Sequence, residues 1–169
     1  LYLATAHGNR ITDVDGNEYI DFALGDTGAM AGHSPEATVK AVHQRIGVEG
    51  GITTMMPSAD AEWVAADLTR RFGLPLWSFA LTATDANRWA LRLARMVTGR
   101  PKVAAFSFCY HGAVDETFVQ MGPGGETLVR RGNVGPAVAV LETTRVMEFN
   151  DLESVERALA HGDVAVLIT

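Results

Sequence analysis

Residues 76–112 read LWSFALTATDANRWALRLARMVTGRPKVAAFSFCYHG, and this stretch indicates the fold class more clearly than the rest of the chain. Residues 76–82 form a short apolar run that predicts a strand. Thr84 is placed to cap a helix, Gly99 to end it, and residues 102–108 form the next apolar strand. Apolar strands separated by a helix predict an α/β domain with a mostly parallel sheet.

The helix predicted within this stretch is amphipathic. One side carries small and apolar residues: Ala86, Trp89, Ala90, Leu93, Ala94 and Val97. The other side carries three arginines: Arg88, Arg92 and Arg95. This spacing follows the 3.6-residue period of a helix.

The same alternation of strands and helices continues towards the carboxyl end. Residues 110–135 are rich in glycine and contain no convincing helix, whereas residues 138–142 predict a strand. Asp151 caps a further helix, and residues 164–168 predict the last strand.

The amino-terminal part has a different pattern. Residues 1–24 predict a β-hairpin, in which Asp15-Gly16-Asn17 forms the turn between residues 10–15 and the returning strand. Ser34 then caps a helix with Pro35 at its first position. The buried face of that helix is predicted from its apolar spacing: Ala37, Val39, Ala41, Val42 and Ile46.

Glycines end this helix, and the domain boundary is expected there. After Gly47, Gly50 and Gly51, a second helix begins at Ser58 and ends at Gly73. We therefore expect a small amino-terminal α+β lobe of residues 1–50 and part of a larger domain in residues 51–169.

Composition narrows the functional classes. The chain has 169 residues, 47% of them hydrophobic, with a formal net charge of −6, which argues against a nucleic-acid partner. Cys109 is the only cysteine, and the chain contains neither an apolar run long enough to cross a membrane nor a signal peptide. Leu1 and Thr169 both stand within or beside apolar stretches. We expect a cytoplasmic protein of which this chain is a fragment.

The first candidate site is the turn that contains Thr82, Ala83 and Thr84. Free amides at the start of a helix, together with the helix dipole, favour a bound phosphate, and the two threonines add hydroxyl donors. The alternative interpretation is an ordinary helix cap, because every α/β protein has several such turns.

The second candidate site is Tyr110-His111, which follows residues 102–108. Ligands of open α/β sheets bind at the carboxyl ends of strands. Tyr110 could stack on a flat cofactor, and His111 could donate a hydrogen bond or transfer a proton. The alternative is a half-buried aromatic residue beside a structural histidine. Cys109 fits apolar packing better than nucleophilic chemistry.

Metal chemistry is not indicated. The five histidines show no ligand spacing with cysteines or carboxylates, so we predict no metal site.

Taken together and in order, these segments resemble the class III aminotransferases, most closely the branch of glutamate-1-semialdehyde aminomutase. The resemblance covers nearly the whole chain. It rests on residues 11–22, Gly32-His33 before Ser34-Pro35-Glu36, residues 82–87, residues 90–95 with Thr98-Gly99-Arg100, Tyr110-His111-Gly112, and Asn150-Asp151-Leu152-Glu153.

The resemblance implies a fold-type I homodimer that binds pyridoxal 5'-phosphate and exchanges an amino group between an amino donor and a keto acceptor. By this analogy Ala83 and Thr84 donate to the cofactor phosphate, Thr82 lines the same turn, and Tyr110, with His111 beside it, stacks on the pyridine ring. The family's Schiff-base lysine is expected beyond Thr169, so no catalytic residue is assigned in this chain. An aminotransferase and an aminomutase, which is an isomerase, both fit this pattern.

Some features depart from the family pattern or leave alternatives open. Ala83 stands where the family usually has glycine, and Asp85 replaces the common glutamate. Asp26 lies where the aminomutase branch usually carries an aromatic residue that faces the substrate. Asp26 therefore either alters the substrate pocket or simply stabilises a turn. A decarboxylase or racemase with the same cofactor, and a non-catalytic α/β module for a phosphorylated small molecule, are the alternative functions.

Overall fold

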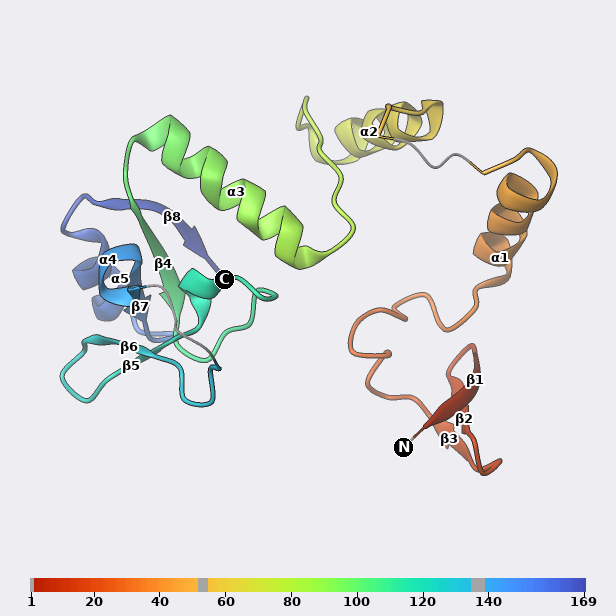
Figure 1. Cartoon of the computed structure of the whole chain (residues 1–169), viewed down its shortest axis with the longest axis horizontal. Coiled ribbons are helices and arrows are strands. Elements are labelled where there is room, and N and C mark those ends of the chain that lie inside the picture. Colours follow the sequence, from red (N-terminus) through yellow and green to blue (C-terminus); the bar gives the residue numbers. More distant parts are fainter. Residues whose placement is uncertain (1, 52–54, 135–138) are drawn as a thin grey trace. The chain divides into compact units, whose positions relative to one another are not determined.

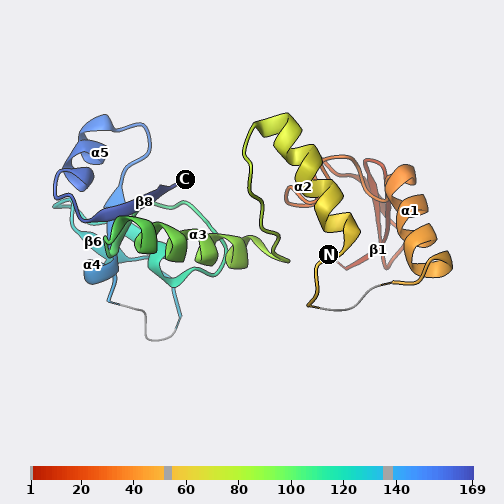
Figure 2. The same ribbon diagram turned by 90° about the horizontal axis from the view of Figure 1, so that it is seen from above.

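The computed structural model describes residues 2–51, 55–134 and 139–169 (Figures 1 and 2). The chain forms two compact units, Leu1–Pro75 and Leu76–Thr169. The boundary predicted near residue 50 lies within the first unit. The division of the whole protein into a small lobe and a larger domain stays a prediction.

The first unit begins with a three-stranded antiparallel sheet. Strands β1 (Leu3–His7), β2 (Arg10–Asp13) and β3 (Glu18–Ile20) lie in that order, and Arg10 is opposite both His7 and Ile20. The predicted hairpin around the 15–17 turn is therefore confirmed as β2–β3, to which β1 adds a third strand.

Asp13 stabilises the turn of this hairpin. Its carboxylate accepts hydrogen bonds from the amides of Asp15 and Asn17, at 3.0 and 2.9 Å, and from the hydroxyl of Tyr19, at 2.9 Å. These donors lower the pKa of Asp13, with the Asn17 side chain as the largest contributor.

The helix that follows differs from the prediction at its start and on its apolar face. Helix α1 (Glu36–His43) begins after Pro35, and it is followed by the π-helix η1 (Gln44–Val48). Ser34 is not the cap, because it has a φ of +49° and its hydroxyl donates to the Ala6 carbonyl at 3.1 Å. The predicted burial of the apolar face is also wrong, since α1 has no buried residue and no described segment of the unit covers that face.

The second helix of the unit follows its sequence signals. Ser58 accepts a hydrogen bond from the Ala61 amide at 3.4 Å, α2 spans Ala59–Phe72, and Gly73 ends it with a φ of +72°. A left-handed terminal residue is the conformation that glycine adopts without a steric penalty.

The second unit is built on a parallel sheet, which confirms the α/β class. Its strands lie in the order β7 (Thr144–Met147), β4 (Lys102–Phe106) and β8 (Val164–Ile168), and β4 pairs in parallel with both neighbours. Helices α3 (Ala83–Thr98) and α5 (Leu152–Leu159) connect to this sheet, and the predicted caps Gly99 and Asp151 are confirmed.

The core of this unit has two sides because residues alternate along β4. Ala104 packs with Met147 and Ala158 of α5, whereas Val103 packs with Leu91 of α3. The two helices thus cover opposite faces of the sheet, as Figure 2 shows.

Two predicted strands are wrong. Residues 76–82 are not a strand, because no described segment forms a ladder with them, and Leu81 is fully exposed. Of the strand predicted at residues 138–142, residue 138 lies outside the described residues, and the rest overlaps helix α4 (Val140–Thr143). The strand itself, β7, starts only at Thr144.

The glycine-rich stretch 110–135 contains no α-helix among its described residues, as predicted, but it contains elements that the sequence did not reveal. A 3-10 turn, η2 (Asp115–Thr117), precedes the antiparallel hairpin of β5 (Val119–Met121) and β6 (Thr127–Val129). The Gly122 amide closes the hairpin by donating to the Glu126 carbonyl at 2.8 Å.

Candidate functional site: two turns at the start of α3

The first turn of α3 is capped by Thr82 and not, as predicted, by Thr84. Thr82 has extended backbone angles, and its hydroxyl accepts from the Asp85 amide at 3.1 Å and donates to the Asp85 carboxylate at 2.8 Å. The helix therefore begins two residues earlier than the cap at Thr84 implied. Because Thr82 uses its proton internally, its hydroxyl is committed to the cap.

The amides of Ala83 and Thr84 remain free at this end of the helix. Within the described part of the chain, neither amide donates a hydrogen bond to an acceptor. Such amides, aligned with the positive end of a helix dipole, attract an anion. We call residues 82–84 the phosphate turn.

A second turn is fixed directly against the phosphate turn. The Ala113 amide donates to the Thr84 hydroxyl oxygen at 2.9 Å, and the Arg88 guanidinium donates to the Ala113 carbonyl at 3.1 Å. The Asn87 side-chain amide donates to the His111 carbonyl at 3.0 Å. We call residues 110–113 the stacking turn. Since Thr84 acts here as an acceptor, its own proton stays available for a ligand oxygen.

Gly112 allows this close approach. Its φ is +79°, and a Cβ atom at this position would lie 2.9 Å from both the amide nitrogen and the Cα of Thr84. A side chain would therefore push the two turns apart.

Tyr110 lies at the other end of the stacking turn with most of its ring uncovered. The side chain is 72% exposed, and its described ring contact is with Phe118, at 6.4 Å between centroids and a tilt of 54°. An aromatic ring with a free face next to an anion-binding turn suits a flat ligand that carries a phosphate.

His111, in contrast, points into the protein. It is 7% exposed, and its buried Nε2 has no hydrogen-bond partner among the described residues. Burial lowers the pKa of this imidazole, so the neutral form is favoured. The structure thus brings Thr82, Ala83, Thr84, Tyr110 and His111 together. The amides of Ala83 and Thr84 and the ring of Tyr110 are available to a ligand, whereas the Thr82 hydroxyl is used in the cap and His111 is buried.

Sequence reasoning missed Asn87 and the packing role of Gly112. Both act through contacts across more than twenty residues of sequence, for which the local pattern carries no signal. Phe108 was missed as well: it has a φ of +62°, which turns the chain sharply after β4. A phenylalanine rarely adopts this conformation, so neighbouring contacts must stabilise it.

Asp26 belongs to the first unit, in a loop that Asp21 and His33 fasten. The Asp21 carboxylate contacts His33 Nε2 at 2.8 Å and accepts from the amides of Ala23 and Gly25 at 2.8 and 2.7 Å. Hydrogen bonding to His33 is the largest cause of the lowered pKa of Asp21. Asp26 itself is exposed with a φ of +56°, and its amide donates to the Ala23 carbonyl at 3.0 Å.

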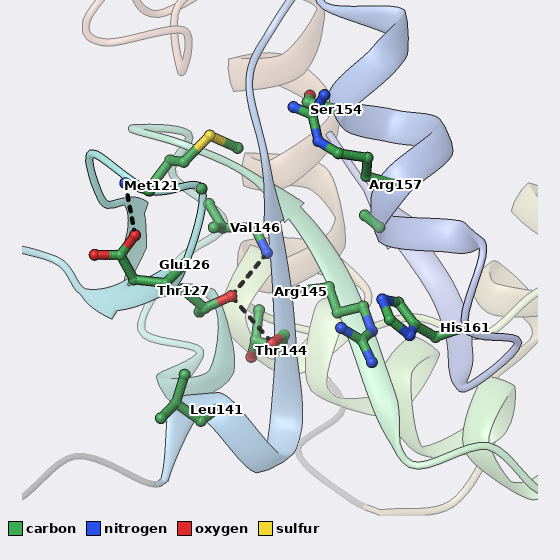
Figure 3. Close-up of a pocket in the computed structure, with 13 residues that line it drawn as sticks. Met121, Glu126, Thr127, Leu141, Thr144, Arg145, Val146, Ser154, Arg157 and His161 are labelled. Carbon is green, nitrogen blue, oxygen red and sulfur yellow. Dashed lines mark hydrogen bonds between the residues drawn. The ribbon is translucent and has the colours of Figure 1, made fainter.

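A separate cavity of about 360 Å³ lies beside β7, lined in part by Arg145, Arg157 and His161 (Figure 3). Two of its polar side chains are already paired. Arg145 contacts Asp163 at 2.7 Å, and the Thr127 hydroxyl accepts from the Val146 amide at 3.2 Å. These bonds already engage Arg145 and Thr127, two of the polar side chains that a ligand in this cavity would meet.

Over residues 2–51, 55–134 and 139–169, no three His, Cys, Asp or Glu side chains gather in a way that could hold a metal ion. The helices in the same ranges are too short or too polar to cross a membrane.

Comparisons with known proteins agree with this geometry. The family model described as Aminotransferase class-III matches residues 1–169. Among curated proteins, the glutamate-1-semialdehyde 2,1-aminomutase of Gemmatimonas aurantiaca is 37% identical over 165 residues, and that of Persephonella marina is 34% identical over 166. The alignments cover 98% and 96% of this chain but 38% of each relative, so the chain spans about two fifths of their length.

Solved structures give the same result. A glutamate-1-semialdehyde-aminomutase from Pseudomonas aeruginosa PAO1 is 49% identical, with a TM-score of 0.90 over 100% of this chain and 37% of its own. A lysine-to-alanine variant of that protein was solved in complex with PMP. An omega-transaminase from Sphaerobacter thermophilus is 31% identical, with a TM-score of 0.87 over 98% of this chain and 40% of its own.

Proposed function

The chain belongs to the class III aminotransferases, and from this premise we propose that the whole protein is a pyridoxal-phosphate-dependent aminotransferase or aminomutase. Its substrates would be an amino acid or amine as donor and a keto acid or aldehyde as acceptor. The observation that carries the proposal is the pair of adjoining turns: one presents the free amides of Ala83 and Thr84, and the other carries the exposed ring of Tyr110.

The described residues fit this cofactor. The Ala83 and Thr84 amides and the Thr84 proton would hold its phosphate, and Tyr110 would cover one face of its ring. When bound, the cofactor supplies an electron-withdrawing ring that stabilises negative charge at the substrate carbon. The neutral, buried His111 would support the stacking turn and keep water from its inner side.

The lysine that this chemistry requires is proposed to lie beyond Thr169. Lys102 is occupied at the amino end of β4, where its Nζ donates to the Leu141 carbonyl at 3.0 Å and lies 3.6 Å from Asp163. Ligands of parallel sheets bind at the opposite, carboxyl ends of the strands. We also propose that the whole protein is a cytoplasmic homodimer, as the family resemblance implies.

Cofactor binding by the full-length protein tests the proposal. Thr84→Ala should weaken binding of pyridoxal 5'-phosphate by about tenfold or more, since it removes a hydrogen bond to a charged group. Thr98→Ala is the matched control: the Thr98 hydroxyl lies at the far end of the same helix and donates to the Ala94 carbonyl at 2.8 Å. If the wild-type protein binds inorganic phosphate but not the cofactor, the non-catalytic module is the better interpretation. Equal effects of the two variants would reject the assignment of the phosphate turn.

Asp26 is proposed to influence which amino donor is accepted. It is exposed on a loop whose conformation Asp21 and His33 fix, so its carboxylate is free to meet a polar group of the substrate. Asp26→Asn in the full-length enzyme should change the relative kcat/KM values for a panel of donors. An unaltered donor profile would leave Asp26 with a role in the turn alone.

A further inference from the structure

Two features in and just before the stacking turn are energetically unfavourable. Phe108 enters it with a strained φ of +62°, and His111 buries an Nε2 that has no described partner. Both features cost free energy that surrounding contacts must offset. Helix α3 supplies some of these contacts: Asn87 donates to the His111 carbonyl, and the Thr84 hydroxyl accepts from the Ala113 amide.

Asn87 supplies a contact of this kind. Its side chain reaches 24 residues along the sequence to donate to the His111 carbonyl, the residue next to Tyr110. It lies one helical turn after the phosphate turn, so a single rigid helix carries both the free amides and the donor that holds the stacking turn.

The contacts of Thr84 do not make Asn87 redundant. Ala113 bonds to Thr84 on the far side of Gly112, whereas Asn87 bonds on the near side of it, adjacent to Tyr110. Without the Asn87 contact, the Tyr110 end of the turn would lose its hydrogen bond to α3. It would keep contacts with other segments, which include the Phe118 ring and the Arg130 hydrogen bond to the Cys109 carbonyl at 3.3 Å.

We propose that Asn87 is a positioning residue that fixes the spacing between the phosphate turn and the Tyr110 ring. This inference rests on the proposed function. A ligand that engages both turns at once gains affinity when their spacing is set in advance, because less ordering remains to be done on binding. A ligand that engages only the phosphate turn gains nothing from Asn87.

The test compares two probes, pyridoxal 5'-phosphate and inorganic phosphate, with the full-length apoprotein. Asn87→Ala should weaken binding of the cofactor by about fivefold to tenfold, the value of one hydrogen bond, and change phosphate binding by less than about twofold. In a Tyr110→Ala background, where no ring needs to be positioned, Asn87→Ala should add less than about a twofold further loss.

Arg95→Lys is the matched control. Arg95 lies two turns further along α3, donates to the Pro101 carbonyl at 2.8 Å and contacts Glu116 at 2.9 Å, so it fastens the same helix away from the stacking turn. It should lower the thermal stability without changing the ratio of the two dissociation constants. Asn87→Ser, which keeps a shorter donor, should restore part of the cofactor affinity.

The outcomes separate the inference from the function on which it rests. A wild-type protein that does not bind the cofactor refutes the proposed function. A wild-type protein that binds it, with Asn87→Ala weakening both probes equally or acting fully in the Tyr110→Ala background, refutes only the positioning role. If neither Asn87 variant folds, Asn87 is a general structural residue and the inference is wrong.

Discussion

The two units of the chain are stabilised by opposite kinds of residues. Among the described residues of the first unit, Asp13 alone is buried, and it is a carboxylate surrounded by hydrogen-bond donors. In the second unit the buried set is mainly apolar and includes Val103, Ala104 and Met147, each fully shielded from solvent.

This difference shows where each unit obtains its stability. The first unit depends on carboxylates that bind backbone amides, at Asp13 for the hairpin and at Asp21 for the loop that precedes α1. The second unit depends on side-chain packing across a parallel sheet. Packing within the sheet gives the two turns of the candidate site a rigid base, whereas the loop of Asp26 rests on a few polar contacts.

The largest effect is expected from a change in the apolar core. Met147→Ala removes a fully buried side chain between β4 and α5, which should lower the free energy of unfolding of the second unit by about 2–5 kcal/mol. Hydrogen exchange followed by mass spectrometry would report the two units separately. Equally faster exchange in the first unit would show that the two units unfold together, and their stabilities could then not be assigned to different kinds of residues.

In the second unit, the sequence predicted the elements whose apolar spacing reports packing. It identified the helix that ends at Gly99, the strand at β8 and the cap at Asp151. It placed the strand before Asp151 too early, because the apolar run ends at Leu141 in helix α4, whereas the strand begins only at Thr144 with a less apolar sequence.

Spacing alone could not show which surface an apolar face meets. The stripe of α3 that contains Trp89 and Val97 is exposed, at 60% and 80%, while Leu91, on another side of the helix, enters the core. The apolar face of α1 is likewise uncovered among the described residues. Amphipathicity indicates that a face is suited to burial, but the covering segment must come from elsewhere in the fold.

The candidate site likewise has one part that the sequence could predict and one part that it could not. The phosphate turn was predictable from local chemistry, since a helix start after an apolar stretch presents free amides wherever it occurs. Its attachment to the stacking turn through Asn87 and Gly112 was not, because it depends on tertiary contacts between α3 and the segment that leaves β4.

An intermediate effect is expected in the first unit from Asp13→Ala. The change removes the acceptor for the amides of Asp15 and Asn17, so these amides should exchange roughly tenfold faster. Asp15→Ala is the control, because the Asp15 carboxylate makes no described contact. Unchanged exchange in Asp13→Ala would mean that cross-strand pairing alone stabilises the hairpin, and the polar account of this unit would be lost.

The smallest effect is expected at Asp163, a charged group at the rim of the apolar core. Arg145 bonds both carboxylate oxygens, at 2.8 and 2.7 Å, and this bonding lowers the pKa of Asp163 from 3.8 to about 2. A lowered pKa in the folded state contributes stability that is complete above pH 3.8 and is lost as the pH falls towards 2. Because the pair is partly exposed, we expect a contribution of about 1 kcal/mol or less.

Asp163→Asn should reduce the acid dependence of the second unit between pH 4 and 2 while leaving that of the first unit intact. Part of it should remain, because Glu116, which Arg95 contacts at 2.9 Å, also has a lowered pKa. The first unit has its own carboxylates with lowered pKa values, Asp13 and Asp21, so it should lose stability in acid in both proteins. Chemical denaturation at several pH values, read by exchange in each unit, measures this difference. If the substitution left the acid dependence of the second unit unchanged, the Arg145–Asp163 pair would contribute nothing measurable to it. The contrast between a polar and an apolar unit would then rest on the core alone.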